Sequence, residues 1–445
     1  MTVGADGRAA GVAVIGGGYA GMAAAVALAG SGIGVTVFEA GKVLGGRARR
    51  VEYRGETIDN GQHILSGAYS EMQKLMARVG VPVESVSRIP LTLAMPPDFS
   101  LRAPRWIAPL HLAWALLTAK GLALSDRLAA IGFMQSLKRS NFRVGATETV
   151  ASLLAAHHQP DKLIRYLWQP LTVSALNTPM DTASAQVFAN VLRDTLASDR
   201  AASDLILPRR DLSGLFPDAA ADWVAARGGC VHRGQRIKSV VVDNGKFQLA
   251  TEAGGSTFNA VIVAIGPHQF ESFSLPADCA VLPAFSYEPI VTIYLKFEQQ
   301  VRLPLPMFGQ VGGMAQWFFD RRQLAADAVA SSRPDGLIAA VISASGAHED
   351  LSQDALAARV LDELGRHTGP LPALAWHKVI IEKFATFACT PSIHTKRPGC
   401  LTATPGIFLA GDYTAGDYPA TIEGAIRSGI SAADHVSRYL STTPS

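Results

Sequence analysis

The stretch VAVIGGGYAGMAAAVALAGSGIGVTVFE, residues 12–39, decides the fold of this chain. An apolar run at 12–15 leads into a glycine-rich turn. An alanine-rich segment and a second apolar run at 35–38 follow, and Glu39 closes the stretch. This order predicts strand, tight turn, helix and parallel strand, the βαβ unit of a Rossmann-like α/β fold.

The glycines of this turn have the spacing of a dinucleotide-binding site. Gly16 allows the tight turn, Gly18 lets the backbone approach a pyrophosphate, and Gly21 lets the helix pack closely on the strand. Glu39, 18 residues after Gly21, is placed to accept hydrogen bonds from ribose hydroxyls. The alternative is a glycine-rich turn in an ordinary α/β protein, which would not require the acid at this position.

Two further segments favour a flavin dinucleotide over a nicotinamide one. Gly45-Gly46-Arg47-Ala48 supplies a second glycine pair and a guanidinium for the longer cofactor's phosphates. Near the end of the chain, an apolar strand at 407–410 runs into Gly411-Asp412, and Thr421 opens the last helix. Asp412 is placed to bond ribitol hydroxyls or a phosphate-bound water, and the helix N-terminus faces the flavin. An ordinary turn aspartate is the alternative for Asp412.

The rest of the chain divides into two interleaved domains. A helix is predicted at 69–79, a hairpin at 239–251 around Asn244-Gly245, and a buried parallel strand at 260–265. The family resemblance described below implies a discontinuous FAD-binding domain of residues 1–87, 215–275 and 396–445. The insertions 88–214 and 276–395 form an α+β, partly helical substrate domain.

One segment, residues 106–124, is apolar nearly all round and predicts a helix. It is either a lid or helix at a membrane interface, or a buried helix of the substrate domain. Trp106, Trp114, Arg102 and Arg105 favour peripheral contact with a membrane surface. Ser125 to Arg127 predicts the cap of a second helix that continues through Leu137.

Composition excludes several classes of protein. Charged residues make up 17% and hydrophobic residues 48% of the 445-residue chain, which suits a lipid substrate or a membrane surface. A net charge of +3 without a basic run argues against nucleic acid. The four cysteines are widely spaced and predict neither a disulfide framework nor a metal site. No signal peptide or spanning segment is predicted, so we expect a cytoplasmic protein, peripheral on the inner face of the cytoplasmic membrane.

These motifs together resemble the FAD-dependent amine oxidase and phytoene desaturase superfamily. The resemblance rests on GGGYAG, Glu39, GGRA and the terminal GDYTAGDYPATIEGAIRSG. Within it, the block at 58–69 (IDNGQHILSGAY), LWQPL at 167–171, Ala175-Leu176-Asn177 and Leu207-Pro208 resemble the squalene-associated FAD-dependent desaturases, understood as hydroxysqualene dehydroxylases of hopanoid biosynthesis. The resemblance covers nearly the whole chain and is weakest between 91 and 143.

The resemblance implies FAD as cofactor, a long apolar isoprenoid as substrate and an external electron donor, since no second glycine fingerprint is present. Thr421 stands where amine oxidases carry an aromatic ring of their amine cage, which argues against amine oxidation. Aromatic residues at 308 and 317–319 line a tunnel or belong to the core. The cofactor contacts that we expect are Gly16, Gly18, Tyr19, Ala20, Gly21, Glu39, Ala40, Gly45, Gly46, Arg47, Gly61, Gln62, His63, Ile237, Gly411, Asp412, Thr421 and Ile422.

The expected reaction is reductive removal of the hydroxyl of hydroxysqualene, with hydride from the flavin N5. A hydroxyl is a poor leaving group and needs a general acid. His63 is the candidate, with Asp59 orienting it, and Tyr413 and Tyr418 are other proton donors; alternatively Asp59, Gln62 and His63 only shape the loop beside the flavin. Two other functions stay open: an oxidative carotenoid or polyprenyl desaturase, and a non-catalytic isoprenoid-binding module.

Overall fold

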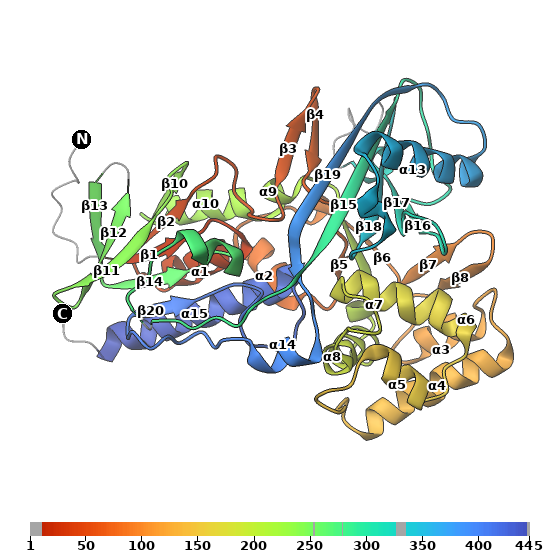
Figure 1. Ribbon diagram of the computed structural model, residues 1–445, viewed down its shortest axis with the longest axis horizontal. Coiled ribbons are helices and arrows are strands. Elements are labelled where there is room, and N and C mark those ends of the chain that lie inside the picture. The colour runs from red at the N-terminus through yellow and green to blue at the C-terminus, as the bar shows by residue number, and fades with distance from the viewer. Residues whose placement is uncertain (1–10, 252–253, 278, 326–334, 443–445) are drawn as a thin grey trace.

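The computed structural model describes residues 11–251, 254–277, 279–325 and 335–442. It contains two five-stranded sheets, several smaller sheets and a helical layer (Figure 1). None of the helices in these described ranges is long and apolar enough to cross a membrane.

The first large sheet is parallel and contains the predicted βαβ unit. Four of its strands are wholly or mostly buried and carry apolar runs, as expected for a sheet covered on both faces, whereas the edge strand Cys230–Arg233 is mostly exposed. The strand order is β10 (Cys230–Arg233), β2 (Val35–Glu39), β1 (Val12–Ile15), β14 (Ala260–Val263) and β20 (Ile407–Leu409). The predicted strands at 12–15, 35–38, 260–265 and 407–410 are therefore confirmed, and the fold class is α/β.

Helices and a small sheet cover this parallel sheet. The helices are α1 (Tyr19–Gly30), α10 (Pro217–Ala225) and α15 (Ile422–Thr442). Contact between α1 and α15 depends on small residues, because a Cβ at Gly429 would lie 2.1 Å from the Ala20 carbonyl oxygen. The small sheet is β11 (Ser239–Asp243), β12 (Lys246–Thr251) and β13 (Gly254–Phe258).

The predicted hairpin is β11–β12. Asn244 and Gly245 both have positive φ, 51° and 73°, as the two central residues of a type I′ turn require. The hairpin prediction is confirmed. The strand β13, which extends it to three strands, was not part of that prediction.

The second large sheet is antiparallel. Its order is β16 (Met307–Gly309), β17 (Trp317–Asp320), β18 (Gly336–Ser343), β15 (Tyr287–Phe297) and β19 (Leu374–Phe387). One face packs on α13 (Gln353–Thr368). The other face borders a cavity, described below with its lining residues.

Small sheets and short helices connect these parts. The strands are β3 (Arg50–Tyr53), β4 (Glu56–Asp59), β5 (Leu65–Ser66), β6 (Val86–Ile89), β7 (Thr92–Met95), β8 (Phe99–Arg102) and β9 (Leu205–Pro208), with short helices η1 (Val83–Ser85), η3 (Ala201–Ser203), η4 (Pro267–Ser272), η5 (Ala347–Asp350), α9 (Leu212–Leu215), α11 (Arg321–Leu324) and α14 (Pro391–Lys396). The predicted helix at 69–79 is confirmed as α2 (Ser70–Arg78). The domain boundaries given above stay a prediction.

The helical layer follows β8 along the chain. It comprises α3 (Leu110–Leu117), α4 (Leu124–Arg139), α5 (Val150–Ala156), α6 (Asp161–Leu163), a π-helical segment η2 (Ile164–Trp168), α7 (Gln169–Leu176) and α8 (Ala185–Leu196). Trp168 is fully buried in its core, with Phe133 and Phe188 edge-on to its ring.

The predicted helix at 106–124 was wrong in its length. Only Leu110–Leu117 is helical, because Pro109 immediately precedes it and proline disfavours helical backbone at the residue before it. The cap predicted at Ser125 to Arg127 is confirmed at Asp126, and the predicted helix through Leu137 is α4, which begins at Leu124. The carboxylate of Asp126 closes its first turn by accepting from the Ala123 N–H at 2.8 Å.

Candidate functional site

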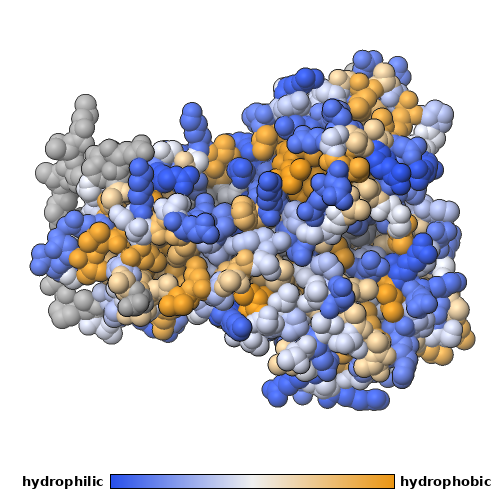
Figure 2. All heavy atoms as spheres, in the orientation of Figure 1, coloured by the Kyte–Doolittle hydropathy of each residue, from blue (hydrophilic) through white to orange (hydrophobic). Residues whose placement is uncertain are grey.

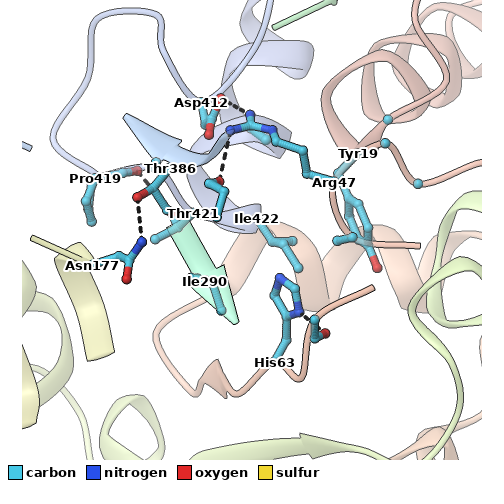
Figure 3. Close-up of a pocket in the computed structure, with 18 of the residues that line it drawn as sticks. Tyr19, Arg47, His63, Asn177, Ile290, Thr386, Asp412, Pro419, Thr421 and Ile422 are labelled. Atoms are coloured by element: carbon cyan, nitrogen blue, oxygen red, sulfur yellow. Dashed lines mark hydrogen bonds and ion pairs between the residues drawn. The ribbon is translucent and has the colours of Figure 1, made fainter. Parts of the chain in front are cut away.

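A cavity of about 780 Å³ joins the end of the parallel sheet to the free face of the antiparallel sheet. This volume lies within the range of small-molecule and cofactor sites. One part of its wall comes from glycine loops and the start of α15. The other part comes from α7, α8 and strands of the second sheet. Figure 3 shows residues from these separate segments around the same space.

The first glycine loop leaves open space where a phosphate would approach. Gly16 has φ +111°, and a Cβ on Gly21 would lie 1.9 Å from the Gly16 carbonyl oxygen, so both positions require glycine for the fold itself. A Cβ on Gly18 would meet nothing closer than 3.8 Å. In the described part of the chain no side chain caps the first N–H groups of α1, which begins beside this space. An open, positively polarised helix start fits a pyrophosphate.

The second glycine loop lies directly against the first. The Gly45 N–H donates to the Gly17 carbonyl oxygen at 2.9 Å, and Gly45 and Gly46 both have positive φ. Arg47, next in the chain, pairs with Asp412 from the far end of the sequence at 2.6 Å. It also donates to the Ala385 carbonyl oxygen at 3.0 Å (Figure 3). Arg47 and Asp412, both predicted for flavin binding, thus form one ion pair at the cavity.

Glu39 holds the loops that surround it. Its carboxylate accepts from the Gly17 N–H at 2.7 Å and the Gly41 N–H at 2.6 Å, and the residue still lines the cavity. Each carboxylate oxygen has a second acceptor position, so these bonds are compatible with the predicted bonds from a ribose. Glu39 therefore has a structural function that the sequence did not reveal.

The start of α15 faces the cavity with Thr421 and Ile422. Thr421 caps the helix by accepting from the Gly424 N–H at 3.1 Å. The next acid, Glu423, is fully buried and points elsewhere: it accepts from the Glu71 and Met72 N–H groups, each at 3.0 Å. Glu423 therefore satisfies the N-terminus of α2 and joins that helix to α15.

His63 lines the cavity, and its ring is oriented by the backbone. Its Nδ1 lies 2.7 Å from the Gly61 carbonyl oxygen, so Nδ1 carries the proton and Nε2 is left to bond a ligand. Burial lowers the pKa of His63 below its usual value of 6.5, opposed by the bond to Gly61. The neutral ring is therefore the main form at pH 7.

Asp59 lies behind the cavity wall and makes no bond to His63 within the described part of the chain. Its carboxylate accepts from the Leu212 N–H at 2.8 Å and lies 3.8 Å from the guanidinium of Arg321. Burial raises the pKa of Asp59 to about 7, against the lowering effect of Arg321. Arg321 also donates to Gln62, which lines the cavity, at 3.1 Å. Arg321 was missed by sequence reasoning because nothing in its local sequence marks it.

The two candidate tyrosines differ in position. Tyr413 is 1% exposed, does not line the cavity, and packs its ring on Phe270 and Phe285. Its hydroxyl has no hydrogen-bond partner among the described residues. Tyr418 does line the cavity, and burial raises its pKa to about 12. Of the two, Tyr418 is the better placed to meet a substrate.

The aromatic residues predicted for a tunnel divide by strand alternation. Trp317 and Phe319 line the cavity, whereas Phe308 and Phe318 pack in the core beside α13. The Trp317 indole donates to Ser174 of α7 at 3.0 Å. Asn177 supports the same wall, because its side chain bonds to Glu288, Pro289, Thr386 and Ala344. Nothing in the sequence around Asn177 indicated that its side chain would link these strands.

The structure brings most of the predicted site residues to one cavity. Three of the predicted residues do not line it: Gly21, Asp59 and Tyr413. Gly21 acts through packing, as expected, and Asp59 through neighbouring residues. His268, which lines the cavity near Arg47, was not predicted; its ring stacks on Phe384 at 4.3 Å.

Comparison with known proteins supports a flavin site. The chain is 28% identical over 435 residues to the hydroxysqualene dehydroxylase of Sinorhizobium fredii, covering 95% of this chain and 97% of that protein. It is 23% identical to the 15-cis-phytoene desaturase of Arabidopsis thaliana, covering 94% of this chain and 78% of that protein. An oxidoreductase structure from Methanosarcina mazei matches with a TM-score of 0.74 at 16% identity, over 95% of this chain and 99% of that one.

The model of the flavin containing amine oxidoreductase family matches residues 19–437, nearly the whole chain. The open glycine loops, the uncapped start of α1 and the Arg47–Asp412 pair suit the dinucleotide that such proteins hold. The chain therefore belongs to the flavin containing amine oxidoreductase family and is an FAD-dependent oxidoreductase.

Proposed function

We propose that this chain removes the hydroxyl of hydroxysqualene to give squalene. The observation that carries the proposal is the cavity, which runs from the glycine loops to a wall that includes Trp317, Phe319 and Leu91. A polyprenyl chain suits that wall, and the relative from Sinorhizobium fredii carries this activity in its name. Thr421 in place of an aromatic residue agrees with a substrate other than an amine.

The cofactor is proposed to lie along the glycine loops. Gly18, Gly46 and the start of α1 would hold its phosphates, Glu39 its ribose, and Thr421 and Ile422 its ring. Reduced FAD, when bound, supplies a hydride from N5, so that a C–H bond replaces the C–O bond and water leaves. The electrons come from an external donor.

His63 is proposed to supply the proton that the leaving hydroxyl needs. Its Nδ1–H is held by Gly61, so a proton on Nε2 would face the substrate. Because burial lowers the pKa of His63 below its usual value, the protonated form is a minority at pH 7 and increases as the pH falls. The reductive rate should therefore rise as the pH falls toward the pKa of His63.

A reducing experiment tests the reaction and the acid together. The flavin of the purified protein is reduced with dithionite without oxygen, hydroxysqualene is added, and flavin reoxidation and squalene are followed by absorbance and mass spectrometry. We expect stoichiometric squalene, a loss of roughly 10²–10⁴-fold in His63→Ala, and near-normal rates in Tyr413→Phe. A loss in Tyr418→Phe with normal rates in His63→Ala would transfer the acid function to Tyr418.

The second candidate function is an oxidative polyprenyl desaturase. The same cavity would accept its substrate, and the Arabidopsis relative carries such a name. In that case the reduced flavin would stay reduced with hydroxysqualene, and the oxidised protein would bleach when a polyprenyl hydrocarbon is added.

We also propose that the protein attaches peripherally to the inner face of the cytoplasmic membrane, where it reaches a substrate dissolved in lipid.

A further inference from the structure

An apolar surface lies where α3 and α4 begin. Seven of the fifteen large hydrophobic side chains that the described residues leave exposed fall within residues 106–128. We call them the apolar corner: Trp106, Ile107, Leu110, Trp114, Leu117, Leu124 and Leu128. Figure 1 places α3 and α4 at the end of the molecule opposite the β11–β12–β13 sheet, and Figure 2 shows hydrophobic and hydrophilic side chains intermingled there.

The exposure of the apolar corner follows from the helix geometry. Leu110, Trp114 and Leu117 recur at the spacing of one helix face, while His111 and Ala115 are buried on the other. The uncovered face of α3 is thus apolar, while the covered face carries His111 and Ala115. The Trp106 and Trp114 rings lie 5.0 Å apart and form one exposed aromatic cluster. Clustered exposed apolar side chains of this kind mark an interaction site.

Positive charge surrounds the apolar corner. Residues 102–128 contain four Arg or Lys and one Asp, a net charge of +3, which equals the net charge of the whole chain. Arg102, Arg105 and Lys120 are exposed and make no ion pair with any described residue. Asp126 is buried, and its carboxylate accepts a hydrogen bond from the Ala123 N–H. Apolar side chains with tryptophan, edged by free cations, match the interface of an anionic bilayer.

The apolar corner is also one layer away from the cavity. On the buried face of α3, the Nε2 of His111 lies 3.1 Å from the hydroxyl of Ser203, and Ser203 lines the cavity. Beside it, the Ala103 N–H donates to the carbonyl oxygen of Leu91, another lining residue. A surface that touches lipid here would hold the cavity wall at the membrane.

We propose that the apolar corner is the docking surface for an anionic lipid bilayer and that it presents the cavity to substrate in the membrane. The choice of occupant rests on the free cations: a second copy of this chain would bring Arg102, Arg105 and Lys120 against like charges. The delivery of hydroxysqualene rests on the proposed function, whereas the docking surface does not.

Vesicle flotation of the FAD-loaded protein tests the surface. We expect binding to phosphatidylcholine vesicles containing phosphatidylglycerol, and a loss of at least about 10-fold in Ile107→Glu/Leu110→Glu. The matched control is Val241→Glu/Val242→Glu, which changes two exposed residues of β11 at the opposite end and should float as wild type.

The triple variant Arg102→Gln/Arg105→Gln/Lys120→Gln should bind anionic vesicles roughly 100-fold more weakly. Equal flotation of all variants, or a dimer that hides Trp106 and Trp114 and floats no vesicles, would overturn the proposal.

Turnover then separates the surface from the chemistry. With hydroxysqualene in vesicles, Ile107→Glu/Leu110→Glu should lose rate in parallel with binding, and with substrate dispersed in detergent it should match wild type. If wild type converts no hydroxysqualene in either form, the proposed function fails while flotation still decides the surface. A wild-type rate on vesicles for a variant that no longer floats would refute delivery through the apolar corner.

Discussion

One wall of the cavity is formed mainly by main-chain groups, and the other is formed by side chains. The cofactor wall consists largely of backbone: glycines at 16, 18, 45 and 46, free N–H groups of α1 and the Glu39 carboxylate that holds the loops. The apolar wall consists of side chains such as Trp317, Phe319 and Leu192, brought together from several elements. Short motifs specify the cofactor wall, because the residues of each loop decide how closely its main chain can approach the cofactor. The apolar wall depends on which face of each strand the fold covers.

The largest expected effect comes from adding one methyl group to the cofactor wall. Gly21→Ala should lose at least about 4 kcal/mol of stability, because the new Cβ would lie 1.9 Å from the Gly16 carbonyl oxygen. Gly18→Ala adds the same methyl where nothing lies closer than 3.8 Å, so it should fold normally and bind FAD at least about 10-fold more weakly. Thermal unfolding of the flavin-free proteins and flavin titration distinguish the two, and equal unfolding temperatures would contradict this difference.

The next effect concerns a buried charge cluster that joins β4 to the antiparallel sheet. Glu56 on β4 pairs with Lys296 on β15 at 2.6 Å and with Arg322 at 2.7 Å, all nearly buried. These two cations lower the pKa of Glu56 to about 2 from 4.5, despite burial. Its stabilisation is therefore complete above pH 4.5 and is lost as the pH falls toward 2.

Removing this carboxylate should leave two buried cations with Asp335 as their one remaining ion-pair partner among the described residues. Glu56→Gln should cost about 3 kcal/mol at pH 7 and flatten the decline of stability between pH 4.5 and 2. Denaturant unfolding across this pH range measures both effects. Glu71→Gln, which breaks the more exposed Lys74 pair, should change stability by less than about 0.5 kcal/mol. If Glu56→Gln lost as little stability as Glu71→Gln, the cluster would contribute little to the stability of the protein.

The smallest effect concerns the apolar wall. Trp317→Phe removes the bond to Ser174 that holds this side chain at the cavity, so it should raise KM for the substrate and lower stability by about 1 kcal/mol, the worth of one hydrogen bond. Its neighbour Phe318 points to the opposite face, so Phe318→Leu should lower stability and leave KM unchanged. If both substitutions altered KM alike, the alternation of the two faces would not govern the site.

Much of the cofactor wall was predictable from local sequence. The βαβ unit, the hairpin at Asn244-Gly245 and the positions of Glu39, Arg47 and Asp412 at the cavity follow from short motifs. The ion pair between Arg47 and Asp412 was not predictable, since 365 residues separate the partners. Neither was the function of Glu423, whose carboxylate accepts from two N–H groups at the start of α2.

The sequence alone determined the parallel sheet and its glycine loops, because turn geometry and close packing depend on residues a few positions apart. Only the tertiary structure decided which aromatic residues line the cavity, that Asp59 faces Arg321 instead of His63, and that α3 is short and half exposed. Each of these depends on which element packs on which face. A single apolar or charged residue carries no information about its distant neighbour until the chain has folded.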